Sequence, residues 1–280
     1  MSTTNLLKAF ANLKQVKNFS LPDIYSGPNR VNSMGTALEL FVKDAFTSSF
    51  NSKSLSDKDR AYSKHLSYIG NANNPPDFMI RDGDAVEVKK IQSPNSDLAL
   101  NSSYPKNRLY KDNPLITKAC RQCEKWDVKD IIYAVGVVKN KRLDLLWFVY
   151  GDCYAADKEI YESVRNKIVK GIQSIGNIER SKTRELARVN RVDPLGITYL
   201  RVRGMWGIEN PTRVFSHLSI DRQNKPSIAA IMKEEKFNSF PAPDREALQK
   251  FEGVMIEDIE IKDPNNPARF MKAKLVKITK

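Results

Sequence analysis

Two carboxylates and one ammonium are spaced so that they could act together on a phosphodiester. Asp77 precedes a turn signal at residues 81–84, and Glu87 and Lys89 follow it. Side chains alternate along a strand, so Glu87 and Lys89 would share one face, and closing the turn would bring Asp77 beside them. Carboxylate oxygens suit Mg²⁺, which neutralises an anionic phosphate and lowers the pKa of a bound water. These residue types predict that Asp77 and Glu87 bind Mg²⁺ and that Lys89 positions the attacking water or stabilises charge on phosphorus.

Three further residues could contact the metal or the phosphate. The carbonyl of Val88, between Glu87 and Lys89, is a possible metal ligand. Glu39 lies beside the apolar face of a predicted helix, where it is either an acidic ligand or a glutamate at the helix rim. Gln92 could touch the phosphate or its water, although a polar residue at a strand end is the plainer interpretation. The acidic pair with its lysine could also be an ordinary solvated strand face, but the turn and strand around it favour chemistry.

The apolar pattern predicts the elements that position these residues. A helix is expected over residues 33–50, capped by Ser33, and a second over residues 157–175. Their apolar stripes comprise Met34, Leu38, Phe41, Val42, Ala45 and Phe46, and Ile160, Val164, Ile168, Ile172 and Ile175. Strands are expected at residues 77–80, 85–91, 131–138, 143–150, 197–203, 254–261 and 270–278. The fold class is therefore α/β (mixed α+β), with a central mixed β-sheet flanked by helices.

Charge and composition narrow the class of protein. The chain of 280 residues has 41% hydrophobic residues, which indicates a folded protein. Its net charge of +13 suggests a polyanionic partner, although a merely basic soluble protein is the equally weighted alternative on charge alone. Residues 1–20 lack the apolar run of a signal peptide, and no stretch is long enough for a membrane span. Cys120, Cys123 and Cys153 suit a reducing interior, so we expect a cytoplasmic protein. The spacing of Cys120 and Cys123 could suggest zinc, but packing thiols on a helix are favoured because four suitably spaced ligands are lacking.

Longer stretches resemble a known family. The pattern Pro76-Asp77, Glu87-Val88-Lys89 is similar to the PD-(D/E)XK nuclease superfamily. Further stretches resemble one branch of it, the NgoPII-like type II restriction endonucleases of bacteria. They are residues 32–39, 70–71, 73–77, 96–103, 187–196 and 201–207. The similarity extends from about residue 30 to about residue 215.

The resemblance implies a fold, an activity and partners. It implies a PD-(D/E)XK core with added DNA-recognition elements, and Mg²⁺-dependent double-strand cleavage of DNA at a short palindrome of the GGCC type. It also implies a homodimer and a companion DNA methyltransferase in a bacterial cytoplasm. The family's two metal-binding acids fall on Asp77 and Glu87, and its lysine on Lys89. We expect one endonuclease domain over residues 1–280, with the catalytic core at about 30–180 and recognition and C-terminal elements at about 181–280, although residues after about 180 could form a separate lobe.

A restriction enzyme must read base edges, and arginine to guanine is the commonest specific contact. In the expected strand at residues 197–203, Tyr199, Arg201 and Arg203 share one face, while Leu200 and Val202 should face a core. Arginines that contact only phosphate, or only pair with acids, are the alternative. The candidate DNA-binding residues are Asn101, Ser102, Ser103, Lys106, Arg108, Asn190, Arg191, Asp193, Tyr199, Arg201 and Arg203.

Two other functions fit the same sequence. A structure-specific or repair nuclease on the same core would cut without regard to sequence. A basic DNA-binding protein with a decorative acidic pair would bind DNA and leave it intact.

Overall fold

The computed structural model describes residues 4–21, 30–71, 74–220 and 226–278; residue 73 and the side chains of Ser33 and Met34 lie outside the described part. The helices are α1 (Leu6–Gln15), α2 (Arg30–Thr47), α3 (Leu55–His65), α4 (Lys118–Gln122), α5 (Lys158–Gln173), α6 (Pro211–Val214), α7 (Glu234–Ser239) and α8 (Ala242–Gln249). The strands are β1 (Leu66–Asn71), β2 (Asn74–Ile80), β3 (Ala85–Ile91), β4 (Leu98–Asn101), β5 (Arg108–Tyr110), β6 (Val128–Lys139), β7 (Arg142–Tyr150), β8 (Glu179–Arg180), β9 (Ala187–Asn190), β10 (Leu200–Val202), β11 (Trp206–Ile208), β12 (Ser227–Lys233), β13 (Val254–Asp263) and β14 (Asn266–Ile278).

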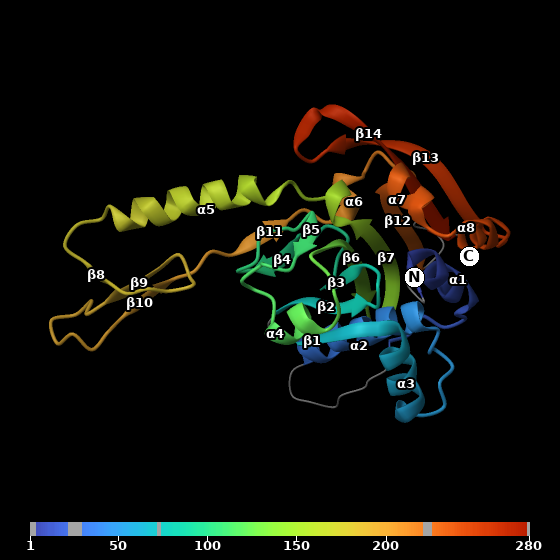
Figure 1. Cartoon of the computed structure of the whole chain (residues 1–280), viewed down its shortest axis with the longest axis horizontal. Helices are drawn as coiled ribbons and strands as arrows, with labels where there is room; N and C mark the ends of the chain where they lie inside the picture. Colours follow the sequence, from blue (N-terminus) through green and yellow to red (C-terminus); the bar gives the residue numbers. More distant parts are fainter. Residues whose placement is uncertain (1–3, 22–29, 72–73, 221–225, 279–280) are drawn as a thin grey trace.

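A large mixed β-sheet forms the centre of the molecule (Figure 1). Within the described residues it has nine strands, in the order β1-β2-β3-β6-β7-β12-β14-β13, with β5 paired to β6 beside that path. β3 lies parallel to β6 and β12 lies parallel to β7, whereas the hairpin partners are antiparallel. The expected mixed α/β class, with a mixed sheet and helices around it, is confirmed.

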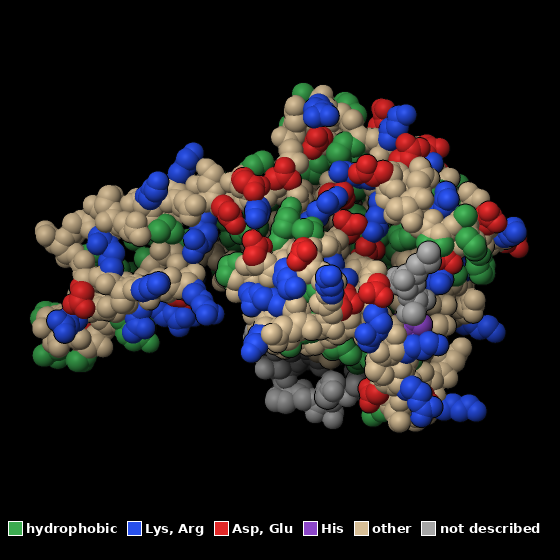
Figure 2. Space-filling view, viewed as in Figure 1, with side chains coloured by type: hydrophobic (Ala, Val, Ile, Leu, Met, Phe, Trp, Pro, Cys, Tyr) green, Lys and Arg blue, Asp and Glu red, His purple; other side chains and the backbone are tan. Residues whose placement is uncertain are grey.

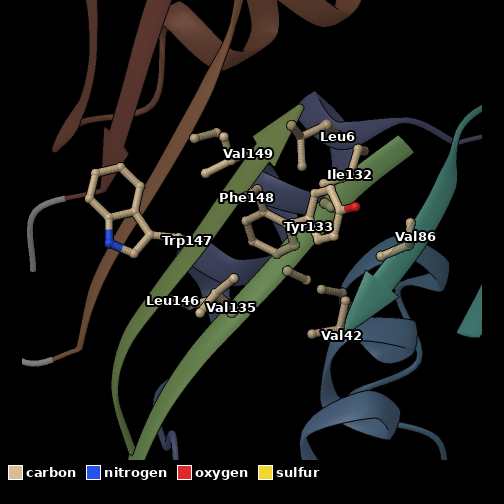
Figure 3. Packing of buried hydrophobic residues seen from close by; sticks show 14 of the residues in the cluster. Leu6, Val42, Val86, Ile132, Tyr133, Val135, Leu146, Trp147, Phe148 and Val149 are labelled. Atoms are coloured by element: carbon tan, nitrogen blue, oxygen red, sulfur yellow. The ribbon is translucent and has the colours of Figure 1, made fainter. Parts of the chain in front are cut away.

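β6 and β7, which lie in the middle of the sheet, have the clearest apolar strand pattern. Residues 131–138 form an unbroken buried apolar run, as expected for a strand covered on both faces. Asn140 and Lys141 at the turn have φ angles of 46° and 63°, the left-handed values of a tight hairpin turn. The hairpin predicted here is confirmed, and it supplies much of the hydrophobic core (Figure 3).

Aromatic side chains join the sheet to the N-terminal helices. The rings of Phe10 on α1 and Phe46 on α2 have their centroids 5.7 Å and 6.1 Å from that of Phe148 on β7. The predicted stripe on α2 is buried over Leu38, Phe41, Val42, Ala45 and Phe46. The helix begins at Arg30, so the prediction that Ser33 caps its start is wrong. Apolar periodicity identified the buried face of α2 but did not define its first turn.

The C-terminal strands belong to the same sheet. β12 pairs with β7 on one side and with β14 on the other, and β13 and β14 form the expected hairpin. The residues after 226 therefore complete the central sheet and do not form a lobe apart from it. None of the helices in the described ranges has the length and hydrophobicity of a membrane span.

Residues 158–203, here called the arm, project from the body of the molecule (Figure 1). The arm consists of α5 and a ribbon in which β9 lies between β8 and β10. The predicted helix is present, but none of its residues is buried, and Ile160, Val164 and Ile168 are each 47–48% exposed. An amphipathic helix thus presents its apolar stripe at the surface.

The expectation that Leu200 and Val202 face a core is wrong. The strand is shorter than predicted, Leu200 is exposed and Val202 is half-buried. β10 pairs with β9 in the arm, so alternation separates two faces of a thin ribbon and not a core face from a solvent face.

Candidate active site

The β2–β3 hairpin brings the predicted carboxylates together at the point where the two strands separate. Their backbone pairing includes Met79 with Ala85 and Phe78 with Val86, and it stops there. Beyond this point the side chain of Asp77 replaces the backbone pairing: its Oδ2 accepts a hydrogen bond from the Val88 amide at 2.6 Å. Asp77 is thereby fixed beside the strand that carries Glu87.

The close approach of β1 helps to hold this geometry. A Cβ on Gly70 would lie 2.3 Å from the carbonyl oxygen of Pro76 and 3.0 Å from that of Asp77. Only glycine permits such contact between the two backbones. The sequence interpretation did not select Gly70, although an isolated glycine in a strand is itself a signal of close backbone approach.

Glu87 and Lys89 share one face of β3, as predicted. Lys89 Nζ donates to Glu87 Oε1 at 2.6 Å. Within the described part of the chain, the other oxygen, Glu87 Oε2, is buried and has no hydrogen-bond partner. Buried polar atoms are nearly always paired, so an orphaned carboxylate oxygen marks a place where a cation fits.

The electrostatics of the three groups are strongly coupled. Burial raises the pKa of Asp77 to about 8, and the neighbouring charge of Glu87 adds to the rise. Burial alone would lower the pKa of Lys89, but the negative charges of Glu87 and Asp77 outweigh it and leave that pKa raised. The metal-free site therefore tends to retain protons, which a divalent cation would displace.

The other predicted metal contacts are less closely placed. Glu39 on α2 accepts a hydrogen bond from Lys43 Nζ at 2.6 Å, and its charge reaches Asp77 and Lys89. In the described ranges, no group of three or more His, Cys, Asp or Glu side chains is arranged to hold a metal. Gln92 is exposed just beyond the end of β3. The acidic pair Asp77 and Glu87 is thus the best-defined candidate for a cation.

The loop that follows β4 returns to the site. Asn101, which has a φ angle of 52°, and Ser102 are exposed, and Arg108 lies 3.5 Å from Asp130. Ser103 and Lys106, by contrast, line the same small cavity as Glu87. The prediction for this loop concerned DNA contacts alone and did not foresee that Lys106 is buried near the acidic pair.

The remaining predicted DNA-binding residues lie on the arm, apart from the acidic pair (Figure 1). Glu185 accepts hydrogen bonds from Arg201, at 2.6 and 2.8 Å, and from Arg203 at 2.5 Å. These contacts hold the pKa of Glu185 below its usual value. Both arginines therefore already have an acidic partner, which is one of the alternatives that the sequence left open.

Other residues of the arm shape its tip. Asp193 accepts from the amides of Leu195 and Thr198 at 2.9 and 2.6 Å and so closes a tight loop. The Arg188 guanidinium lies 4.3 Å from the centre of the Tyr199 ring. Asn190 accepts from Arg188, and Arg191 lies 3.5 Å from Glu179. Basic side chains are prominent on this part of the surface (Figure 2).

The interpretation of Cys120 and Cys123 as packing thiols on a helix agrees with their positions in α4 and at its C-terminal end. Cys120 and Cys153 are buried, Cys123 is half-buried, and all three are free thiols. Burial raises the pKa of Cys120 to about 12, as expected for a packing thiol.

Comparison with known proteins defines the class. The chain is 49% identical over 276 residues to the type II restriction enzyme NgoPII of Neisseria gonorrhoeae, covering 97% of this chain and 98% of that protein. No solved structure matches the chain. With a paired acidic site on a mixed sheet, the protein is a type II restriction endonuclease, a site-specific deoxyribonuclease.

The particular family follows from a second comparison. The family model of the NgoPII restriction endonuclease matches residues 4–262, which is most of the chain. The chain belongs to the NgoPII restriction endonuclease family. The family suggested by the sequence stretches is therefore confirmed.

Proposed function

We propose that this restriction endonuclease makes Mg²⁺-dependent double-strand cuts at a short palindrome of the GGCC type, on a core of the PD-(D/E)XK kind. The observation that carries the proposal is the acidic pair Asp77 and Glu87, in which one Glu87 oxygen accepts from Lys89 while the other, the buried Oε2, has no partner among the described residues. A restriction enzyme needs one such centre for each strand that it cuts.

Asp77 and Glu87 would hold the ion, with the Val88 carbonyl as a further ligand and Glu39 as a more distant acid. When bound, Mg²⁺ neutralises the phosphate and lowers the pKa of a water. Lys89, anchored on Glu87, orients the attacking water or stabilises charge on phosphorus. Gln92, exposed just beyond the end of β3, would contact the phosphate or its water.

The DNA contacts divide into two groups. One group follows β3 in the sequence and suits contacts with the sugar–phosphate backbone. It consists of Asn101, Ser102, Ser103, Lys106 and Arg108. The arm residues Asn190, Arg191, Asp193, Tyr199, Arg201 and Arg203 are candidates for reading or supporting the target site. Because Glu185 holds Arg201 and Arg203 in fixed positions, they could present their remaining donors to guanine with little loss of side-chain freedom.

A homodimer would match the two-fold symmetry of a palindrome. The half-exposed apolar stripe of α5 supports association, since soluble monomers rarely leave such stripes uncovered. We further expect a companion methyltransferase that protects the host's own sites in the bacterial cytoplasm.

A digest of a plasmid of known sequence tests the proposal. The digest is run with Mg²⁺ and with EDTA, and the fragment ends are sequenced. Discrete Mg²⁺-dependent fragments that end at one repeated GGCC-type palindrome would support it. A smear of ends, or fragments that also form with EDTA, would contradict it.

Asp77→Ala provides the matched test of the site. We expect lost cleavage with retained specific binding, measured by anisotropy with the identified duplex. Sedimentation velocity at several concentrations tests the dimer, and a protein that stays monomeric on its duplex would contradict that part.

A further inference from the structure

Lys106 is a buried lysine whose side-chain hydrogen bonds go to uncharged groups. It lies in the segment between β4 and β5, and only 6% of it is exposed. Its Nζ donates to the hydroxyl of Ser103 and, at 3.5 Å, to the carbonyl oxygen of Tyr104, both uncharged groups. Among the described residues, no carboxylate lies within ion-pair distance of this ammonium. A buried charge of this kind is costly unless a ligand supplies the counter-charge.

The backbone of Lys106 is hydrogen-bonded to β6, the strand next to β3, which carries Glu87. Its amide donates to the hydroxyl of Tyr133 at 2.7 Å, and Tyr133 on β6 is fully buried. Tyr133 is the register partner of Glu87 in the parallel pairing of β3 with β6. Lys106 is therefore held at the level of Glu87, although the two residues belong to separate parts of the chain.

A third contact brings the loop close to the sheet. A Cβ on Gly151 would lie 2.4 Å from the Lys106 carbonyl oxygen. Such close packing leaves the Lys106 backbone little freedom, and the hydrogen bond to Ser103 orients its ammonium.

Lys106 also shares a cavity with Glu87, one of the two acids. Glu87, Ser103, Lys106 and Tyr133 line one small cavity. The ammonium thus lies near the Glu87 carboxylate without forming an ion pair with it. The cavity has a volume of about 10 Å³, which suits one oxygen atom of a larger anion and not the whole group. Such an oxygen would be stabilised by the ammonium on one side and by a cation held on Glu87 on the other.

We propose that Lys106 is a catalytic residue that donates a hydrogen bond to a non-bridging oxygen of the scissile phosphate. The assignment rests on the proposed active site around Asp77 and Glu87. The ammonium transfers no proton. It stabilises the negative charge on the phosphate oxygens, which persists while water adds to phosphorus, the P–O3′ bond breaks and, overall, one proton of the water ends on the departing 3′ oxygen.

The test is a binding cycle without metal, so that it does not depend on turnover. Wild-type protein and Lys106→Met are titrated in EDTA with two duplexes that contain the identified site. One duplex has the natural phosphodiester at the scissile position and the other a neutral methylphosphonate. We expect Lys106→Met to bind the natural duplex about ten-fold or more weakly than wild type does. The two proteins should bind the methylphosphonate duplex alike.

A merely structural role predicts a different pattern. It would weaken both duplexes by the same factor, and that outcome, like equal binding of both by the two proteins, would overturn the proposal. Lys106→Gln keeps a donor for Ser103 and replaces the methionine variant if the latter does not fold. Lys106→Arg keeps the charge and should preserve most of the preference for the natural duplex.

Two matched variants separate this proposal from the wider one. Lys90→Gln alters a half-buried lysine on the opposite face of β3, so its preference should equal that of wild type. Asp77→Asn should abolish Mg²⁺-dependent cleavage if the active site is placed correctly. Retained cleavage would refute that site, whereas lost cleavage with an unaltered Lys106 cycle would refute the role of Lys106 alone.

Discussion

Replacing Asp77 with asparagine should stabilise the metal-free protein while removing its activity. The carboxylate is buried, and both burial and Glu87 disfavour its ionised form. The asparagine keeps a carbonyl oxygen for the Val88 amide and has no charge to bury. Because each pKa unit corresponds to about 1.4 kcal/mol, the rise from 3.8 to about 8 means that the ionised carboxylate could cost up to about 6 kcal/mol. Glu87 and Lys89 can readjust, so we expect about 2 kcal/mol, or roughly 5 °C in Tm for a chain of this size.

The direction of the Asp77 pKa shift determines how the stability of the wild-type protein depends on pH. An aspartate whose folded-state pKa lies above its unfolded value takes up a proton on folding, so its contribution to stability falls as pH rises from about 4 towards 8. The advantage of Asp77→Asn over wild type should therefore be smaller at pH 5 than at pH 8. Thermal unfolding in EDTA across this range measures it, and added Mg²⁺ should raise the Tm of wild type only.

Asp84→Asn is a control on the same hairpin that should lower the stability where Asp77→Asn should raise it. Asp84 accepts from Tyr150 at 2.7 Å and from Lys236 at 2.7 Å, so its loss leaves a half-buried lysine with one acidic partner fewer. That variant should melt below wild type. The reasoning about Asp77 would be refuted if Asp77→Asn melted below wild type at pH 8, or if its advantage did not change with pH.

Three more variants test other parts of the structure. Lys89→Met should lower the single-turnover cleavage rate by about 10² or more and leave binding nearly unchanged, since Lys89 acts on the reacting atoms; an equal loss of binding would contradict this. Gly70→Ala should reduce both cleavage and Tm, at a cost of about 1–3 kcal/mol, because a Cβ there meets the backbone of the strand that carries Asp77; a fully active variant would refute the contact. Glu185→Gln should release Arg201 and Arg203, so that the affinity for unspecific DNA rises. That affinity should also decrease more steeply as the salt concentration increases; an unchanged salt slope in anisotropy titrations would contradict the pairing.

The sequence carried most of the information about the site because the site is local. Asp77, Glu87 and Lys89 belong to one hairpin, and alternation along β3 with a short turn is enough to bring them together. Lys106 is different. It reaches the site through Tyr133 on another strand, a contact between distant parts of the chain that no periodicity reveals.

The arm shows the opposite limit. Periodicity correctly predicted α5 and its apolar stripe, but a stripe does not state what covers it, and here the described chain leaves it half-exposed. Likewise, alternation at Leu200 and Val202 indicated a strand but not whether a layer lay behind it. The pairing of Glu185 with Arg201 and Arg203 depends on how the ribbon folds back, which charge types alone do not specify.

The place of β12 in the sheet has a consequence for how the protein is made. β7 is synthesised long before β12, the strand that pairs with its open edge, and β14 comes later still. A ribosome-bound chain therefore carries a long apolar edge with no neighbour, and such edges template aggregation. Contacts this far apart in sequence also slow folding. A host would thus have an interval between synthesis and a completed nuclease, and shortening the chain before β12 should yield insoluble protein instead of a smaller enzyme.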